Sequence, residues 1–426
     1  MEHTKTLLEE FAAQQHQERL AEIYVDPGVL PYQCTRYQQA IREFENLYGS
    51  GEAEIYSAPG RSEVGGNHTD HQHGEVLAAS INLDAIAIVR RTDENQIQLL
   101  SDGYPMITAD LSSLENKKEE EGTSVGLIRG MAYGLQKNGH KIGGFQAYVT
   151  SDVLNGAGMS SSAAFEVLVG TILSGLYNEM SVSPVEIAQV AQYAENVYFG
   201  KPCGLMDQMA CSVGGLIHID FADPASPIVE KVEVDFGAYK HSLCITDTKG
   251  SHADLTDDYA RIPQEMKKVA KYFGKDFLRE VDPASFFKEL PKIRKKCGDR
   301  PVLRALHFFE EDKRVEKEVS ALREGDFQAF LQTVKESGDS SFKYLQNIYT
   351  NKDVQNQSVS IGLAVSDSIL PGHGVSRVHG GGFAGTIQAF VADDFVEEYR
   401  RGLDNVYGEG SCHVLKVRPF GGIKVL

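Results

Sequence analysis

Apolar residues recur at two different spacings along the chain, and this mixture predicts both helices and strands. Within residues 1–50 they recur every three or four positions, which is the period of an amphipathic helix. Pro27 and Pro31 separate two such stretches. Residues 54–59 are a short strand candidate that runs into a glycine-rich segment. Residues 76–90 are rich in Val, Ile and Ala, and we expect a pair of buried strands there.

The rest of the chain continues this mixture. Helices are predicted at 163–177 and 184–198 and from Ser124 onward, and strands at 145–149, 215–221 and 241–247. The second half is mostly helical and charged, with Asp326 placed to cap one of its helices. Strand character returns at 374–390, around three consecutive glycines.

A chain of 426 residues is long enough for two or three domains. The best candidate for a boundary is the segment 221–229, where two prolines lie in a polar stretch. We therefore predict a helical extension at 1–50, an N-terminal domain at 51–225 and a C-terminal domain at 226–426.

The net charge of the chain argues against two classes of binding partner. Sixty Asp and Glu residues face 42 Lys and Arg, for a formal net charge of -18, which argues against nucleic acid and against an anionic membrane surface. The first ten residues lack the basic and apolar regions of a signal peptide, and no run of 18 apolar residues occurs. The six cysteines include no CxxC pair. These features predict a cytoplasmic protein with reduced thiols.

The first candidate site is the segment 59–74, which combines glycines with an arginine, an aspartate and three histidines. Its glycines let a ligand approach the backbone. Asn67 and Asp70 can accept hydrogen bonds from sugar-like hydroxyls, and Arg61 can neutralise an anion. One alternative is a polar turn with solvated histidines. Another is a metal site, whose ligands would be His68, Asp70, His71 and His73.

The second candidate site, residues 156–164, follows a predicted strand and opens a predicted helix. Backbone N–H groups at a helix N-terminus bind anions, and glycines admit a phosphate close to the chain. The hydroxyls of Ser160, Ser161 and Ser162 can bind phosphate oxygens or Mg²⁺. The segment is not a Walker A loop, because no Gly-Lys-Ser/Thr follows. The alternative is a capped helix after a tight turn.

The third candidate is Asp207, an acid in an apolar stretch that contains Gly204. Such a residue can be a buried general base or an ordinary helix cap. The sequence alone does not separate these two interpretations.

The fourth candidate, residues 379–385, matches the GxGxxG spacing formally. Residues 386–391 have the pattern of a strand, whereas a dinucleotide site requires a helix at this point. We therefore reject dinucleotide binding and predict a strand, a glycine turn and a second strand that support a catalytic face. A plain hairpin is the alternative.

Together and in this order, the four motifs resemble those of the GHMP small-molecule kinases, and within them the galactokinases. Pro59-Gly60-Arg61 with His68-Thr69-Asp70 resembles the galactokinase sugar signature, and 156–164 resembles the superfamily's ATP loop. Tyr193-Ala194-Glu195 and 202–208 are similar to the segment that holds the magnesium carboxylate and the catalytic aspartate. Residues 379–385 resemble the third superfamily motif. The likeness runs from about Tyr56 to the end of the chain.

The resemblance implies a two-domain GHMP kinase fold of the α+β class. The N-terminal domain would hold a mixed sheet with helices and the C-terminal domain an antiparallel sheet with helices, and the last strand is a candidate to return to the N-terminal domain. The active site would lie in the cleft between them. The implied activity is an ATP- and Mg²⁺-dependent sugar 1-kinase that acts on galactose, with a monomer favoured.

The same resemblance implies residue roles. Asp207 would accept the proton of the anomeric hydroxyl as it attacks the γ-phosphate, and Arg61 would lower the pKa of that hydroxyl or stabilise the transferred charge. The sugar would be bound by Arg61, Asn67, His68, Asp70, Gly204, Asp207 and Tyr259. The ATP phosphates would be held by Gly156, Ala157, Gly158, Met159, Ser160, Ser161 and Ser162. Mg²⁺ would be bound by Ser161 and Glu195.

Two positions depart from the family pattern. Galactokinases usually have Glu at the position of Asn67, where it reaches the C6 side of the sugar, and a neutral amide also tolerates a C6 carboxylate. A galacturonate 1-kinase is therefore an alternative function. Ser251 stands where Arg commonly precedes the following His252, which would slow the reaction if that position steadies charge. A sensor that binds galactose and ATP without catalysis is a further alternative, disfavoured by the intact serine loop and Asp207.

Overall fold

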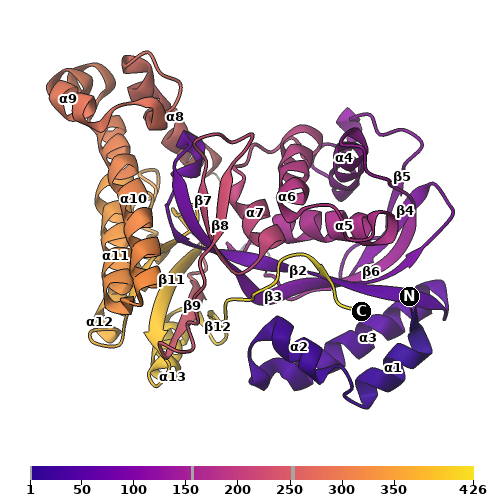
Figure 1. Cartoon of the computed structure of the whole chain (residues 1–426). Coiled ribbons are helices and arrows are strands. Elements are labelled where there is room, and N and C mark those ends of the chain that lie inside the picture. Colours follow the sequence, from indigo (N-terminus) through magenta and orange to yellow (C-terminus); the bar gives the residue numbers. More distant parts are fainter. Residues whose placement is uncertain (1, 155–157, 251–254) are drawn as a thin grey trace.

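The computed structural model describes residues 2–154, 158–250 and 255–426, which form two sheets with helices around them (Figure 1). Nine of the described strands form the larger sheet, in the order β1-β2-β3-β6-β4-β5, with β13 beside β2 and the β7–β8 pair beside β3. The pairing is antiparallel except between β4 and β6. The bounds are β1 Glu2–His3, β2 Glu52–Gly65, β3 Glu75–Arg91, β4 Gln96–Ser101, β5 Ile107–Asp110, β6 Phe145–Ser151, β7 Leu216–Asp220, β8 Ile228–Lys231 and β13 Ile423–Lys424.

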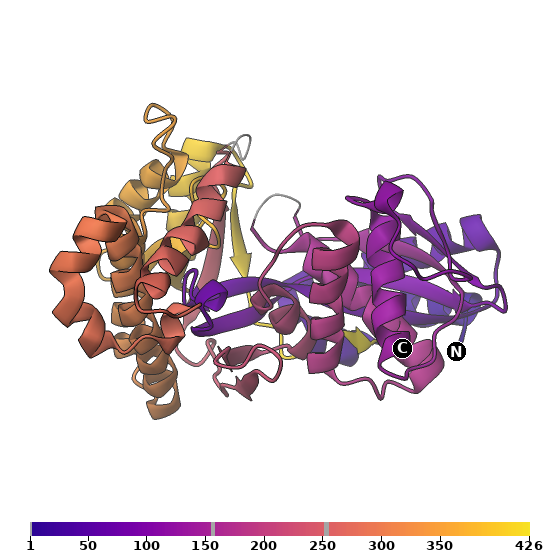
Figure 2. The ribbon, with the colours of Figure 1, turned by 90° about the horizontal axis from the view of Figure 1, so that it is seen from above.

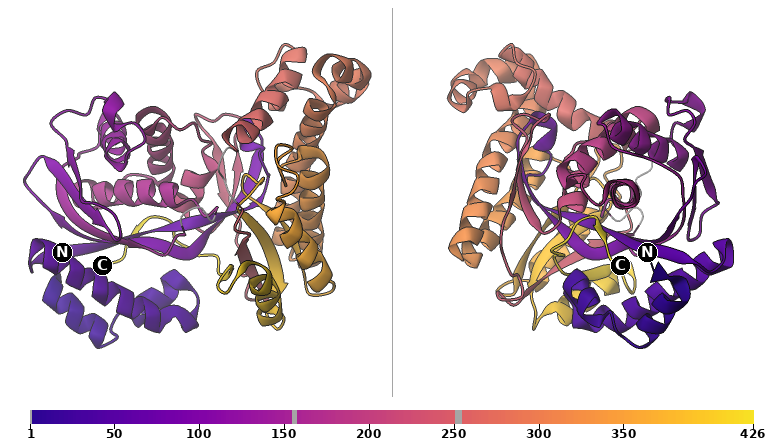
Figure 3. Two further views of the ribbon diagram at one scale, coloured as in Figure 1. Left: turned by 180° about the vertical axis from the view of Figure 1, so that it is seen from behind. Right: turned by 45° about the vertical axis from the view of Figure 1, so that its right-hand side comes forward.

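Different helices cover the two faces of the larger sheet, as Figures 1 and 3 show. Successive side chains of a strand point to opposite faces. Tyr56 of β2 and Ala87 of β3 pack with one set of helices, whereas Ile55 and Ile88 pack with the other. The first set is α4 Ser124–Lys137, α5 Ser161–Asn178, α6 Pro184–Tyr193 and α7 Met206–Val213. The second set is α1 Thr4–Ala12, α2 Gln17–Tyr24 and α3 Leu30–Tyr48.

A buried ionic cluster joins the N-terminal helices to the sheet. Asp84 of β3 has no exposed surface and accepts hydrogen bonds from Arg36 at 2.7 Å, from Arg418 at 2.8 Å and from Tyr24 at 2.9 Å. The predicted extension at 1–50 is thus a packed layer that covers the second face of the sheet.

The smaller sheet and the remaining helices lie at the other end of the molecule, as the view from above shows (Figure 2). This antiparallel sheet has the order β10-β11-β9-β12. Its strands are β9 His241–Asp247, β10 Gly374–His379, β11 Thr386–Ala392 and β12 Cys412–Leu415. The helices are α8 Thr256–Tyr272, α9 Pro283–Cys297, α10 Asp299–Glu324, α11 Phe327–Ser340, α12 Ser358–Ile369 and α13 Val396–Tyr407. Asp326 caps α11 by accepting a hydrogen bond from the Ala329 N–H at 3.0 Å, as predicted.

Two strands of the predicted C-terminal domain, β8 and β13, belong to the larger sheet. After β12 the chain returns to the larger sheet, where Ile423 of β13 pairs with Ser57 of β2. Strand β8, at Ile228–Lys231, pairs with β7, so the larger sheet extends past residue 225.

Among the described residues, no helix is long and apolar enough to cross a membrane.

The strand pair predicted at 76–90 was wrong, because Glu75–Arg91 is one continuous strand. Asp84 could interrupt an apolar run, but Arg36 and Arg418 neutralise it inside the sheet. Strand β2 likewise continues beyond Pro59 to Gly65, through register shifts at Pro59/Arg61 and Glu63/Gly65. Bulges bend a strand locally, and this part of β2 carries Arg61 and Glu63, which belong to the site described next.

Candidate functional site

A cavity of about 850 Å³ opens where β2, the start of α7, α8 and the glycine turn after β10 meet. It therefore lies between elements of the two predicted domains. Six of the residues that the resemblance implied for the sugar line it: Arg61, His68, Asp70, Gly204, Asp207 and Tyr259. Glu63, Lys201, Gly380 and Gly381 are also in its wall.

Arg61 and Asp207 form a two-pronged ion pair in this cavity. The Arg61 Nε lies 2.6 Å from Asp207 Oδ1, and Nη2 lies 2.7 Å from Oδ2. The Ser160 hydroxyl also donates to Asp207, and Arg61 Nη1 donates to the Gly158 carbonyl. Helix α7 has no side-chain cap, so the helix-cap interpretation of Asp207 finds no support. The pair instead connects β2 and α7 to the glycine-serine turn.

The electrostatics of Asp207 favour its charged form. Burial alone would raise the pKa of Asp207, but the Arg61 guanidinium and the hydrogen bonds from Arg61 and Ser160 hold it below its ordinary value. Because 30% of the side chain is exposed, the carboxylate can still meet a ligand. A charged carboxylate in this position can accept a proton.

The glycine-serine turn packs tightly against β2 at the N-terminus of α5. A side chain at Gly60 would meet the Met159 carbonyl at 2.9 Å, and one at Gly158 would meet the Thr386 hydroxyl at 2.7 Å. Ser160 has a left-handed φ of 59° and Ser161 begins the helix. The start of α5 thus lies beside Asp207, to which the Ser160 hydroxyl donates, and the free N–H groups of a helix N-terminus can bind an anion. Gly156 and Ala157 lie outside the described residues.

Two acidic side chains lie side by side near this turn. The Gln208 amide donates to Glu195 at 2.8 Å and to Glu166 at 3.2 Å, and the Ser162 hydroxyl lies 3.4 Å from Glu195. Lys201 reaches Glu195 at 2.9 Å although 61% of its side chain is exposed. Burial and the nearby Glu195 raise the pKa of Glu166 well above its ordinary value. Its Oε1 is buried and has no partner in the described part of the chain.

The opposite wall presents polar groups at fixed positions. His68 has a left-handed φ of 61° and its Nε2 lies 3.1 Å from the Gly381 carbonyl. Burial lowers the pKa of His68 to about 3, so the ring is neutral. A side chain at Gly204 would come within 1.9 Å of the Asp70 carboxylate. Tyr259 lines the cavity and donates to the Gly382 carbonyl at 2.8 Å.

Asn67 does not line the cavity. Its side chain has no exposed surface and lies behind Glu63, to which it donates at 2.8 Å. Gly66, with a φ of +85°, makes the turn that directs Asn67 inward, and a side chain there would meet the Glu75 carbonyl at 2.4 Å. Of the seven residues implied for the sugar, this one is separated from the cavity.

The histidine metal site proposed as an alternative finds no support. His73 stacks on Phe277 with ring centroids 3.6 Å apart, and across 2–154, 158–250 and 255–426 no group of three His, Cys, Asp or Glu side chains is arranged to hold a metal ion.

Ser251 and His252 lie outside the described residues. The turn between β10 and β11 is followed by a strand, as predicted.

Sequence reasoning missed two acidic residues at the site, Glu63 and Glu166. Glu166 carried a signal, since it is the one charged residue in the apolar helix predicted at 163–177. Glu63 carried no such signal, because the predicted strand ended at residue 59; the structure shows that β2 continues and places Glu63 two residues from Arg61, on the same face.

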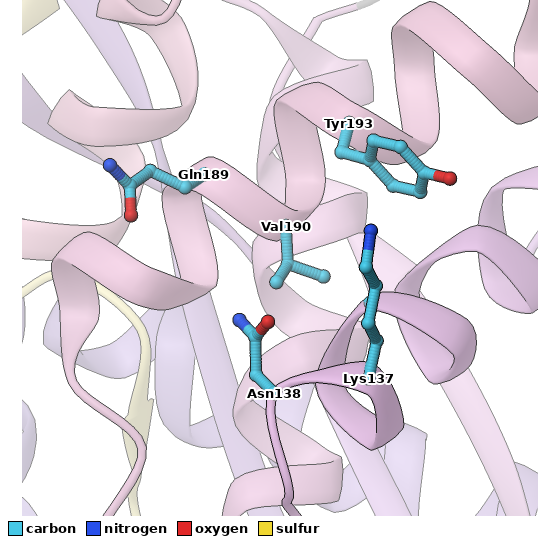
Figure 4. A pocket seen from close by; sticks show the side chains of 6 residues that line it. Lys137, Asn138, Gln189, Val190 and Tyr193 are labelled. Atoms are coloured by element: carbon cyan, nitrogen blue, oxygen red, sulfur yellow. The ribbon is translucent and has the colours of Figure 1, made fainter. Parts of the chain in front are cut away.

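A second, smaller pocket of about 180 Å³ lies between α4 and α6 (Figure 4). Its labelled residues include Lys137, whose ammonium is 5.8 Å from the centre of the Tyr193 ring. Tyr193 belongs to the motif that contains Glu195, but none of the described residues to which the resemblance gave a role lines this pocket. The candidate catalytic residues Arg61 and Asp207 therefore lie in the larger cavity and not in this pocket.

Comparisons with known proteins agree with this geometry. Residues 126–215 match the model "GHMP kinases N terminal domain", and residues 42–91 match "Galactokinase galactose-binding signature". A galactokinase of Actinobacillus pleuropneumoniae is 30% identical over 374 residues, which are 87% of this chain and 93% of that protein. A galactokinase of Streptomyces coelicolor is 29% identical and covers 90% of this chain and 97% of its own length.

Solved structures show the same relationship. Lactococcus lactis galactokinase complexed with galactose superposes with a TM-score of 0.76 at 25% identity, over 90% of this chain and 98% of that one. Methanococcus jannaschii mevalonate kinase superposes with a TM-score of 0.60 at 16% identity, over 86% of this chain and 99% of that one. The second match concerns the fold alone, which is the two-domain GHMP kinase fold predicted from the sequence.

Proposed function

Because the chain belongs to the galactokinase family, within the GHMP kinases, we propose that it transfers the γ-phosphate of ATP to the anomeric hydroxyl of galactose. The product is α-galactose 1-phosphate. That the chain is a sugar kinase follows from its relatives and its fold. The observation that carries the finer proposal is the Arg61–Asp207 pair, which faces the cavity beside the start of α5.

In the proposed reaction the sugar oxygen forms a bond to the γ-phosphorus, and the bond between that phosphorus and the β–γ bridging oxygen breaks. Asp207 accepts the proton that the anomeric hydroxyl loses, and ADP leaves with the bridging oxygen. Arg61 lies within hydrogen-bond distance of Asp207 and stabilises negative charge on the transferred group. Phosphoryl transfer depends mainly on positioning and charge neutralisation, and these residues supply both.

We propose that Ser161 and Glu195 hold Mg²⁺. Two observations support the fit: Glu166 keeps a buried oxygen without a partner in the described residues, and the Lys201 ammonium stands where a cation would meet Glu195. Mg²⁺ commonly takes one or two carboxylates together with substrate phosphates. When bound, it would neutralise charge on the phosphates.

Replacing Glu195 with Gln is expected to raise the Mg²⁺ concentration for half-maximal rate by about tenfold or more, because a charged ligand is lost. The measurement is the rate of ADP release against free Mg²⁺ at saturating sugar. Glu186→Gln is the matched control, since Glu186 is an acid of α6 that contacts His140. An unchanged Mg²⁺ requirement in E195Q would remove Glu195 from the metal site.

The alternatives are a galacturonate 1-kinase and a sensor without catalysis. The test is ADP release by the purified chain with Mg-ATP and galactose, galacturonate, N-acetylgalactosamine or glucose. The proposal predicts turnover on galactose above the other three sugars. Turnover confined to galacturonate would establish the first alternative, and galactose binding without ADP release would establish the second.

The structure has all six cysteines unpaired. We propose a cytoplasmic location on this ground, because unpaired thiols are typical of reducing compartments. A monomer remains the proposed state.

A further inference from the structure

Glu63 is a carboxylate in the cavity wall that the proposed reaction does not use. It lies on β2 two residues after Arg61, with 4% of its surface exposed. Its Oε1 accepts hydrogen bonds from Asn67 and from the buried Arg377, both at 2.8 Å. Its Oε2 receives no hydrogen bond from the described residues. Since Oε1 is held on the protein side, Oε2 is the oxygen available to a ligand in the cavity.

Asn67 holds Glu63 and cannot itself meet a ligand. Its amide nitrogen donates to Glu63 and to the Gly380 carbonyl at 2.8 Å. Its amide oxygen accepts from Ser341 at 3.1 Å and from Asn347 at 2.9 Å. These four bonds use the full hydrogen-bonding capacity of an Asn side chain. The neutral residue is thus behind the wall and the acidic residue is in it.

Charged side chains of both signs line the cavity, and most of them have partners. Arg61 is paired with Asp207, and Lys201 is paired with Glu195. Burial keeps the His68 ring neutral. Of the other acids in the wall, Asp70 lies 3.7 Å from His71, whereas Glu63 is contacted by Arg377 from behind the wall. Lys267, a further cation of the wall, lies over the Phe277 ring.

We propose that Glu63 is a specificity-determining residue that accepts a hydrogen bond from a sugar hydroxyl and selects neutral hexoses over hexuronic acids. The inference rests on the proposed sugar-kinase function and names its substrate class. A hydroxyl satisfies the free carboxylate oxygen, whereas a sugar carboxylate would bring two like charges together in a poorly solvated site. Burial raises the pKa of Glu63 to about 7, which is consistent with an incompletely satisfied carboxyl.

The test compares Glu63→Gln with the wild type at pH 8, where Glu63 is charged. Isothermal titration calorimetry without ATP gives the Kd of galactose and of galacturonate, and kcat/KM with Mg-ATP gives the same comparison for turnover. The wild type is expected to prefer galactose by about 100-fold, and E63Q to lose at least about tenfold of that preference, mainly because galacturonate binds better.

Glu311→Gln is the matched control. Glu311 is fully buried on α10 and accepts from the backbone N–H of Gly66 and Asn67, each at 3.3 Å, but does not line the cavity. The preference in E311Q should stay within about threefold of the wild type, because its charge is paired with Arg314 behind the loop. Glu63→Asp retains the charge and should keep the preference for galactose while its galactose affinity falls about tenfold. If E63Q does not fold, E63D still tests the position of the carboxylate, through the expected loss of galactose affinity.

Three results would overturn the inference. These are a wild type that binds galacturonate as tightly as galactose, an unchanged preference in E63Q, and an equal change in E311Q. Galactose binding without ADP release would defeat the proposed kinase activity alone, because the binding preference is measured without turnover. ADP release with an unchanged preference in E63Q would defeat this inference alone.

Discussion

Replacing Asp207 with Asn is expected to lower kcat on galactose by about 10²-fold to 10⁴-fold, the range typical of general acid–base catalysis. The amide keeps the shape of the side chain and can still accept a hydrogen bond from Arg61, but it cannot take a proton at neutral pH. Galactose affinity should stay largely unchanged. Single-turnover rates and calorimetric binding of galactose separate the two effects.

Asp223→Asn provides the control for this variant, since Asp223 lies exposed in the turn before β8. Its kcat should equal that of the wild type. Full turnover by D207N would refute Asp207 as the base. Loss of galactose binding together with turnover would show that Asp207 acts mainly in binding.

Replacing Asp84 with Asn is expected to lower the free energy of unfolding by about 3–5 kcal/mol, because it breaks a buried ion pair from one side. Arg36 and Arg418 would keep buried guanidinium groups with less opposing charge. Urea denaturation at pH 7, followed by circular dichroism, measures the change. A loss below about 1 kcal/mol would contradict the structural role assigned to the cluster.

The matched control is Asp152→Asn, because Asp152 also contacts Arg36, at 3.0 Å, but is 18% exposed. Its loss should be smaller, about 1 kcal/mol. Burial alone would raise the pKa of Asp84, yet Arg36 and Arg418 lower it below its ordinary value. The stability due to this carboxylate is therefore present above about pH 4 and is lost as the pH falls through the lowered pKa of the folded state.

Local sequence patterns predicted much of the fold. The strand at 145–149, the helix at 163–177 and the cap at Asp326 rest on side-chain periodicity and on contacts within a few residues, and the structure contains all three. The single long strand β3 could not be seen in this way. Its continuity depends on Arg36 and Arg418, which meet Asp84 from 48 and 334 residues away.

The candidate site was likewise predicted only in part. The resemblance placed Arg61, His68 and Asp70 in one motif, and the fold brings them to one cavity. It also implied Asn67, whose position is decided by the turn at Gly66 and by distant partners. Ser341 and Asn347 are 274 and 280 residues away, and no local pattern indicates that they hold its amide. Glu63 lines the cavity with its Oε1 held by Asn67 and by Arg377, which is distant in the sequence.

The most direct test of the central claim is ³¹P NMR of the reaction of the wild-type chain with Mg-ATP and galactose. Arg61, Asp207 and the start of α5 should direct phosphate to the anomeric oxygen, so the predicted product is a single phosphomonoester whose phosphorus couples to H1 of the α-sugar. A phosphate on C6, or ATP that remains intact while galactose is bound, would contradict a sugar 1-kinase.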